Sequence, residues 1–250
     1  MRDRLFAGLV HFGASCAVAL CAAALVFWVW YPGILSRAQG IGTIFGIVVA
    51  VDVVLGPILT ILVFNRAKKS LRLDLAVIVV IQLAGLAYGL NTVATARPAY
   101  IVFNKDRFDV VRALDLDAAS LTRAREANNT LAEASWFGPR WVGAVESTDS
   151  KRAKEILFTA AAGGPDWPQL PELYVPLERV TGTIQQRLRS ITVLESANRD
   201  DVEAVRALQA RFPDATAGFL PVRAQIRDVV AIVDRKTGQV LELVDLRPVW

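Results

Sequence analysis

The run VDVVLGPILTI (residues 51–61) carries one carboxylate, Asp52, in the middle of an apolar segment, and Gly56 and Pro57 follow closely. A charged side chain inside a bilayer is costly and normally has a polar partner. Pro57 lacks the N–H that would bond one turn back, so we expect a helix kink at Gly56–Pro57 and a free carbonyl near Asp52. The stretch therefore predicts a membrane helix with a polar site built into it.

Three apolar runs of this kind lie in the first hundred residues. They cover about 5–31, 41–64 and 75–93. Each is close to the ~20 residues that a helix needs to cross a hydrocarbon core of ~30 Å. Backbone polar groups in lipid must be satisfied within the segment, which favours helices. We predict an α-helical membrane bundle of three transmembrane helices over residues 1–95.

The charge balance differs between the two parts of the chain. Residues 97–250 hold 21 Lys and Arg against 21 Asp and Glu, whereas residues 1–96 hold 7 against 3. The formal net charge of +4 therefore comes entirely from the apolar part. A nucleic-acid surface requires a basic patch on the soluble part, so the balance speaks against a nucleic-acid partner.

The basic residues also predict an orientation. Arg2 and Arg4 precede the first helix, and the loop after it carries only Arg37. The loop after the second helix carries four basic residues, Arg66, Lys68, Lys69 and Arg72. The positive-inside rule places the N-terminus and this second loop in the cytoplasm. We expect a multi-pass inner-membrane protein with a periplasmic C-terminal domain, and we favour an uncleaved first helix over a signal peptide.

Two polar residues are predicted to meet inside the bundle. Asp52 lies near the middle of the second helix, and Gln82 lies near the middle of the third at a similar depth. A buried polar membrane pair of Asp52 and Gln82 follows from these positions. Two interpretations remain open: the carboxylate binds a partner helix or relays protons, or it joins the helices of the bundle. One carboxylate is too few for a proton path, which favours joining or partner binding over transport.

Glycines form a second feature of the membrane helices. The second helix contains GTIFG with Gly42 and Gly46, and the third contains GLAYG with Gly85 and Gly89. Small residues four apart allow two helix backbones to approach closely. These four residues are candidates for packing a partner helix in the outer leaflet, and packing within the bundle is the alternative.

Residues 96–250 read as one α+β domain with an antiparallel sheet, ending in a β-hairpin. Strands are expected on both sides of a turn at 104–106, at 141–145, and in the hairpin whose turn is 236–238. Helices are expected at 118–127, 151–162, 181–197 and 201–212, and an ordered proline-rich loop lies between 165 and 176.

The sequence offers little chemistry for catalysis. His11 is the only histidine and lies in the first helix, as do both cysteines, Cys16 and Cys21. Outside the membrane no Ser–His or Cys–His pair and no zinc-ligand spacing is available. The acidic residues between 106 and 117 alternate with Lys and Arg and are read as ion pairs. We expect no enzyme activity, no cofactor and no metal.

Five stretches carry a family resemblance. They are WYPG (30–33), VDVVLGPILTILVFN (51–65), KKSLRLDL (68–75), IQLAGLAYGL (81–90) and ARPAYIVFNKDRFDVV (96–111). These stretches resemble the type IV pilin accessory proteins, most densely over residues 28–111. The resemblance implies an inner-membrane pilus assembly factor, with no catalytic residues to transfer.

The resemblance and the residues together suggest a chaperone-like accessory protein. It would stabilise or present a specific type IV pilin in the membrane for pilus assembly and surface display. Its expected partners are that pilin, other pilus assembly components and the lipid bilayer. The alternative is a membrane-anchored extracytoplasmic sensor or binding subunit of another complex, and a third reading is an enzyme that modifies the pilin.

Overall fold

A computed structural model describes all residues from 1 to 250. Contacts divide the chain into two compact units. The helical unit comprises residues 1–36 and 40–97, and the sheet unit comprises residues 37–39 and 98–250. Residues 37–39 come from the connection between the first two long helices, so the chain enters the sheet unit twice.

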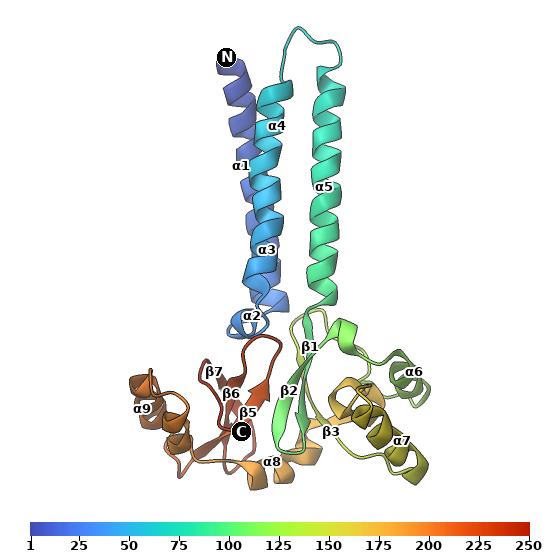
Figure 1. The fold of residues 1–250 in the computed structure, drawn as a ribbon, viewed down its shortest axis with the longest axis vertical. Helices are drawn as coiled ribbons and strands as arrows, with labels where there is room; N and C mark the ends of the chain where they lie inside the picture. Colours follow the sequence, from blue (N-terminus) through green and yellow to red (C-terminus); the bar gives the residue numbers. More distant parts are fainter. The chain divides into compact units, whose positions relative to one another are not determined.

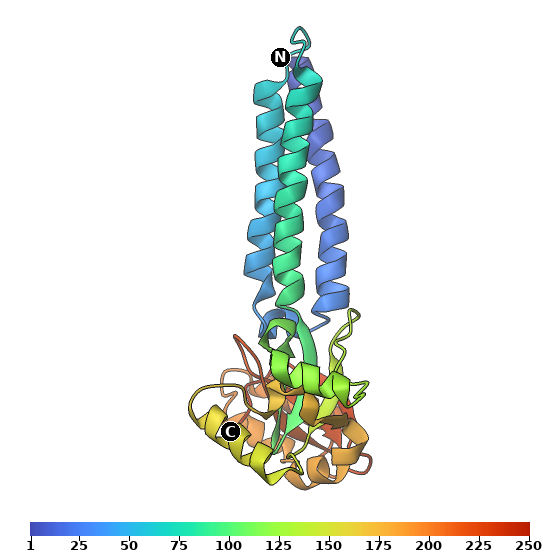
Figure 2. The same ribbon diagram turned by 90° about the vertical axis from the view of Figure 1, so that its right-hand side faces the viewer.

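The helical unit consists of three long apolar helices that stand side by side (Figure 1, Figure 2). They span Arg2–Trp30, Ile41–Val63 and Leu71–Thr95, and each is long and apolar enough to cross a membrane. The first comprises α1 (Arg2–Ala24) and a π-helical end (Leu25–Trp30); the second comprises α3 (Ile41–Ala50), a π-helical turn (Val51–Leu55) and α4 (Gly56–Val63); the third is α5 (Leu71–Thr95). The three predicted long apolar helices are confirmed, with a short unpredicted helix, α2 (Leu35–Ala38), between the first two.

The three long helices share a cluster of buried side chains at the end near Trp30 and Val93. The cluster includes Val26, Phe45 and Val93. The Tyr31 hydroxyl donates to the Val93 carbonyl at 2.9 Å and closes this cluster. Elsewhere α4 packs against both α1 and α5. The three helices therefore share one buried cluster at this end, and toward the other end α4 links α1 and α5.

The sheet unit is built on seven strands in the order β4-β3-β1-β2-β5-β6-β7 (Figure 1). The strands are β1 (Pro98–Asn104), β2 (Arg107–Arg112), β3 (Arg140–Ala144), β4 (Tyr174–Pro176), β5 (Ala217–Arg223), β6 (Val229–Asp234) and β7 (Val240–Val244). Every residue of β1 is buried, as expected for a strand with neighbours on both edges and covered faces.

The sheet is mixed, and the prediction of an antiparallel sheet is corrected. β1 pairs with β3 in parallel, and β2 pairs with β5 in parallel. Parallel neighbours require long crossover connections. The chain supplies them as α6 (Ala118–Glu126) between β2 and β3, and as the helical segments between β4 and β5. Turn residues in the sequence indicate antiparallel hairpins, whereas no local pattern indicates which distant strands pair in parallel.

Both predicted hairpins are confirmed. β1 and β2 pair in antiparallel register around Lys105 and Asp106, with Lys105 at a φ of 62°. β6 and β7 pair around a turn that contains Gly238 at a φ of 68°, a conformation that glycine adopts without steric cost. Turn residues between alternating apolar runs were thus a sufficient signal.

The helix predictions for the sheet unit succeed except at one segment. α6, α7 (Ser150–Ala161) and α9 (Val202–Arg211) lie within two residues of their predicted bounds. The predicted helix 181–197 is wrong: α8 (Thr181–Arg187) ends early and a 3₁₀ segment (Ile191–Ser196) follows. Between them Arg189 exchanges backbone hydrogen bonds with Phe219 of β5 at 3.0 and 3.1 Å. Pairing with a strand far along the chain therefore replaces the local helical bonds.

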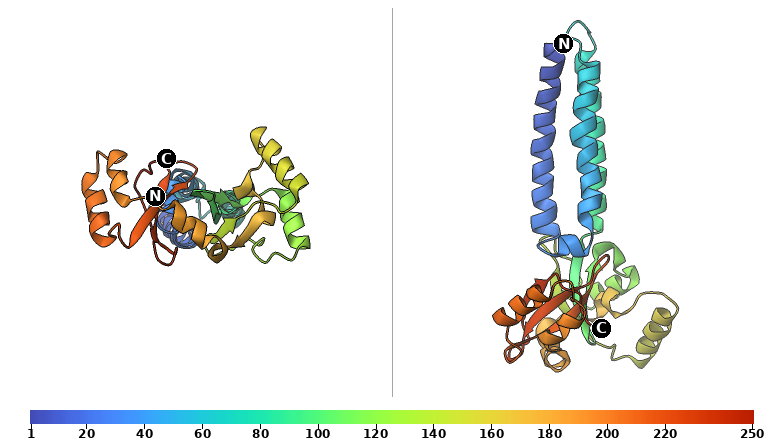
Figure 3. Two further views of the ribbon diagram at one scale, coloured as in Figure 1. Left: turned by 90° about the horizontal axis from the view of Figure 1, so that it is seen from below. Right: turned by 60° about the vertical axis from the view of Figure 1, so that its left-hand side comes forward.

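Two separate cores support the sheet, one at each end. Around β1 and β3, buried residues such as Tyr100 and Val142 pack on Ile156 of α7. Around β5 and β6, Phe219 and Ile232 pack with residues of α9 and of the 3₁₀ segment Ile191–Ser196. Helices α6 and α7 lie beside one end of the sheet and α9 beside the other (Figure 1, Figure 3). β2 and β5 connect the halves by only two residue pairs, Phe108–Val222 and Asp109–Arg223.

Candidate functional site

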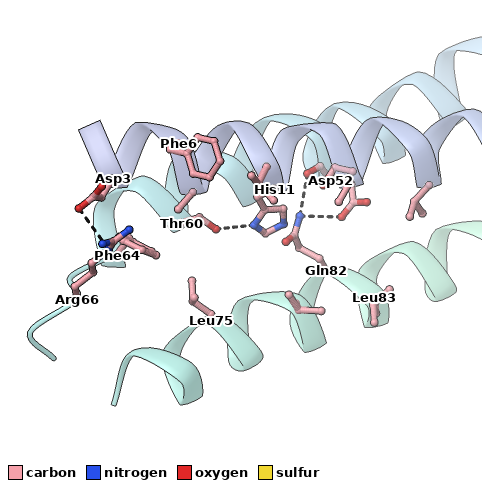
Figure 4. Close-up of a pocket in the computed structure, with 16 residues that line it drawn as sticks. Asp3, Phe6, His11, Asp52, Thr60, Phe64, Arg66, Leu75, Gln82 and Leu83 are labelled. Carbon is pink, nitrogen blue, oxygen red and sulfur yellow. Dashed lines mark hydrogen bonds and ion pairs between the residues drawn. The ribbon is translucent and has the colours of Figure 1, made fainter. Parts of the chain in front are cut away.

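The helical unit contains a lateral groove between α1 and α5. α4 packs against both of these helices, whereas α1 and α5 barely touch each other. The resulting cavity has a volume of about 570 Å³ and extends from Asp3 to Val18 along α1. Its α5 wall includes Leu75, Val79 and Leu83, and Figure 4 shows Leu75 and Gln82 on the side of α5 that faces the other two helices. We call this cavity the α1/α5 groove.

The groove has an apolar lining with a polar floor. Asp52 and Thr60 of the second long helix, His11 of α1 and Gln82 of α5 all line it. Asp52 is 8% exposed and Thr60 3% exposed. In an apolar lining these four side chains must bond to one another or to something that enters the groove.

Gln82 binds Asp52 twice. Its Nε2 donates to Oδ1 of Asp52 at 3.0 Å and to the Asp52 backbone carbonyl at 2.9 Å (Figure 4). The structure therefore brings the two predicted polar residues together. Their use for joining the bundle or for binding a partner stays a proposal.

The local backbone explains why Gln82 reaches a carbonyl. Residues Val51–Leu55 form a π-helical turn, in which a carbonyl accepts from the residue five positions later. For Asp52 that residue is Pro57, which has no N–H. The Gln82 amide takes the place of the missing donor. A π-helical turn thus occupies the position where the sequence predicts a kink at Gly56 and Pro57.

Gly56 makes room for this arrangement. A Cβ built on Gly56 would overlap the carboxamide group of Gln82. Asp52, Gly56 and Thr60 recur every four residues, so they share one face of the second long helix. That face presents two polar side chains with a gap between them, and Gln82 fills the gap.

The sequence reasoning missed one interaction in the groove. His11 Nδ1 lies 2.6 Å from Oγ1 of Thr60, one turn beyond Gly56. The four-residue spacing of Asp52, Gly56 and Thr60 was the available signal, but a lone threonine in an apolar run is unremarkable by itself.

One polar atom of this network remains unsatisfied. Oε1 of Gln82 is buried and accepts no hydrogen bond. Both hydrogen bonds from Nε2 go to Asp52, so the carboxamide is fixed with its oxygen free. A buried acceptor without a donor is uncommon and usually has a reason.

The four predicted glycines differ in their surroundings. A Cβ added to Gly89 would lie 2.7 Å from Val48, so this glycine allows α5 to approach α3. Added Cβ atoms at Gly42, Gly46 and Gly85 would meet nothing within 4 Å. The open three are free to contact another helix, which leaves their predicted partner packing a proposal.

The sheet unit holds a smaller polar hollow of about 240 Å³ where β2 meets β5. Arg107, Asp109 and Arg223 line it, and Arg107 pairs with Asp109 at 3.4 Å. Burial raises the pKa of Asp109, although Arg107 and Arg223 counteract the rise. The other acidic residues of this stretch are also paired, for example Asp115 with Arg112 at 2.7 Å, which agrees with their interpretation as ion pairs.

Comparison with known proteins points in one direction. The model of the family described as fimbrial assembly protein FimB matches residues 1–33. The chain is 30% identical over 220 residues to the fimbrial assembly protein of Dichelobacter nodosus serogroup E1, covering 85% of this chain and 83% of that one. The serogroup I protein gives the same identity and coverage. The protein of serogroups C1 and C2 is 33% identical over 117 residues, which is 46% of this chain and 89% of that one. No solved structure matches the chain.

Proposed function

Because this chain belongs to the family of fimbrial assembly proteins, we propose that it is an inner-membrane accessory protein that stabilises or presents a specific type IV pilin. The pilin is held before it enters the fibre, and surface display of the pilus depends on this step. The role is chaperone-like, with no reaction on the pilin.

The observation that carries this proposal is the polar floor of the helical unit. A bundle that only anchors a domain needs no hydrogen-bonded carboxylate, imidazole and carboxamide within its spans. Here Asp52, His11 and Gln82 all line a cavity that opens between two helices. Such a construction suits a protein that binds another membrane helix.

Orientation follows from the basic residues. The N-terminus and the loop with Arg66 and Arg72 face the cytoplasm, and the sheet unit lies in the periplasm. A membrane-anchored subunit with a periplasmic head would then have both of its parts within reach of this protein. Gly42 and Gly46 of α3 and Gly85 of α5 are further open positions in the outer leaflet that allow close approach of another helix.

The test is a gene deletion with complementation. Total cellular pilin and sheared surface pilin are compared by immunoblot for every pilin of the strain. We expect surface pilin to fall and to recover on complementation, and a parallel fall in total pilin would assign the role to stabilisation. Unchanged surface pilin would contradict the proposal and favour a sensor or binding subunit.

The mass of the pilin provides a second readout. An accessory protein without catalytic activity leaves the intact mass of the pilin the same in wild-type and deletion strains. A mass difference equal to a chemical group would instead assign an enzymatic role. The pilin from the complemented strain is the control for this comparison.

A further inference from the structure

We propose that the α1/α5 groove is the seat of the pilin's transmembrane helix, and that this helix brings a hydrogen-bond donor to the acceptors around Gln82. The inference rests on the proposed function and deepens it. It assigns the contact to one face of the bundle and defines the chemistry of the occupant.

The first step is the unsatisfied acceptor. Oε1 of Gln82 is buried in the groove without a hydrogen-bond donor. Nε2 of Gln82 donates both of its hydrogen bonds to Asp52. Of the two Asp52 carboxylate oxygens, only Oδ1 takes part in them. The open positions at this level are acceptors. Their partner must therefore carry an O–H or N–H group, such as a hydroxyl, an amide, a protonated carboxyl or an amine.

The second step is the solvent that surrounds the groove. In hydrocarbon an unsatisfied polar group costs several kcal/mol because no water is available. An acyl chain fills the apolar walls but donates no hydrogen bond. A protein helix packs apolar side chains against the walls and can place a donor at the depth of Gln82. It therefore satisfies both the apolar walls and the free acceptor.

The third step is size. A helix with its side chains is about 10 Å wide, and two turns of such a cylinder occupy roughly 850 Å³. The groove provides about 570 Å³. It therefore accepts one side of a helix over about two turns and leaves the other side to lipid. Small side chains at Ala7 and Ala14 line the α1 wall and leave room for a helix to approach closely.

Photo-crosslinking in living cells tests the seat with matched positions. A photoreactive residue is placed at Val10 or Leu83, which line the groove, and for comparison at Leu9 or Ile81, which do not. All four positions are 56–68% exposed in the isolated chain. We expect pilin crosslinks several-fold stronger at Val10 and Leu83 than at Leu9 and Ile81. Equal yields on both faces would overturn the assignment.

A groove-filling variant provides a second test. Ala14→Trp fills the groove, whereas Ala17→Trp places the same side chain on α1 outside it. With the photoreactive group at Leu83, Ala14→Trp should reduce the pilin crosslink several-fold and Ala17→Trp should leave it unchanged. Immunoblots of the variants check that both accumulate at wild-type levels. If Ala14→Trp is absent from the membrane, the comparison of Val10 with Leu9 decides alone.

Asp52→Asn tests the chemistry of the occupant. Asn keeps an oxygen for Nε2 of Gln82 but replaces an open acceptor by a donor. If the pilin helix carries a donor, the new donor that Asp52→Asn introduces cannot bond to it, and binding weakens. The crosslink at Leu83 should then fall about three- to tenfold, which is the effect of one hydrogen bond in a membrane. An unchanged or stronger crosslink would overturn the donor assignment.

The outcomes separate this inference from the proposed function. If deletion of the gene lowers surface pilin but the groove positions crosslink only lipid or a second copy of this chain, the proposed function stands and the groove assignment fails. If deletion leaves every pilin unchanged and no pilin is captured at any position, both fail.

Discussion

The two units use their apolar residues in opposite ways. In the sheet unit, Phe219, Val230 and Ile232 are completely buried between the sheet and the helices that cover it. In the helical unit, large apolar side chains such as Trp28 and Leu62 are 81% and 68% exposed, while Asp52 and Thr60 lie inside. The sheet unit is arranged for water and the helical unit for lipid.

This difference changes what stabilises each unit. Water drives the burial of apolar surface at about 25 cal/mol per Å², so the sheet unit gains from each core side chain. Lipid offers no such drive between helices, which associate by close packing and hydrogen bonds. Glycines and polar residues should therefore matter most in the helical unit, and large apolar residues in the sheet unit.

The largest effect should come from the core of the sheet unit. Phe219→Ala removes a fully buried ring and should lower the free energy of unfolding by about 3–5 kcal/mol. Ile47→Ala, at a position 63% exposed on the helical unit, should change it by less than about 0.5 kcal/mol. Thermal unfolding of the full-length protein in detergent measures both. A large loss of stability for Ile47→Ala would contradict the proposed difference between the two units.

Asp214 should give the next largest effect and adds a pH dependence. Burial raises the pKa of this carboxyl, but hydrogen bonds from Ser190, Thr192 and the Ile191 N–H outweigh it and leave the pKa below its usual value. Asp214→Asn should cost about 1.5–3 kcal/mol at pH 7.

The sign of the pH effect follows from the lowered pKa. The stabilisation by ionised Asp214 is complete above the unfolded pKa of about 3.9 and is lost as the pH falls through the folded value. The gap between wild type and Asp214→Asn should therefore narrow at acidic pH. A gap that is independent of pH between 7 and 3 would show that the charge is not involved.

Glycines test the helical unit with a matched pair. Gly56→Ala places a methyl group against Gln82 and should cost about 1–3 kcal/mol. Gly46→Ala meets nothing and should be neutral or slightly stabilising because alanine favours helix. Accumulation in the membrane and unfolding in detergent are the readouts. Equal behaviour of the two variants would contradict packing by close approach.

The smallest effect is expected at Thr60. Thr60→Val removes the oxygen that His11 contacts and should cost about 0.6 kcal/mol, the average for a hydrogen bond between membrane helices. Thr43→Val, at an exposed position of α3, is the control of identical chemistry. Unfolding in detergent should show a smaller loss of stability for Thr60→Val than for Gly56→Ala. The reverse order would mean that hydrogen bonds stabilise the helical unit more than close packing does.

Prediction from the sequence worked where the signal was local. The three long helices follow from run length, and the two hairpins follow from turn residues between apolar runs. β5 was missed because Pro221 and the absence of alternation hide a strand that is buried on both faces. β4 was missed because three residues within a proline-rich stretch carry no pattern.

The candidate site was predictable only in part. Asp52 and Gln82 were expected to meet because both lie at mid-depth, and the distance of 3.0 Å reflects that simple geometry. The bond between His11 and Thr60 and the gap between α1 and α5 depend on helix rotation and on which helices touch. No single run of sequence contains that information.

The sequence by itself determined the apolar lengths, the charge asymmetry, the turns and the presence of one carboxylate in a membrane helix, because each depends on residues close together in the chain. Tertiary structure alone decided the mixed order of the sheet, the π-helical turn completed by Gln82 and the open groove with its unsatisfied acceptor. These features arise when segments distant in the sequence compete for the same backbone and side-chain partners. Which pairing forms depends on the energies of all the contacts together.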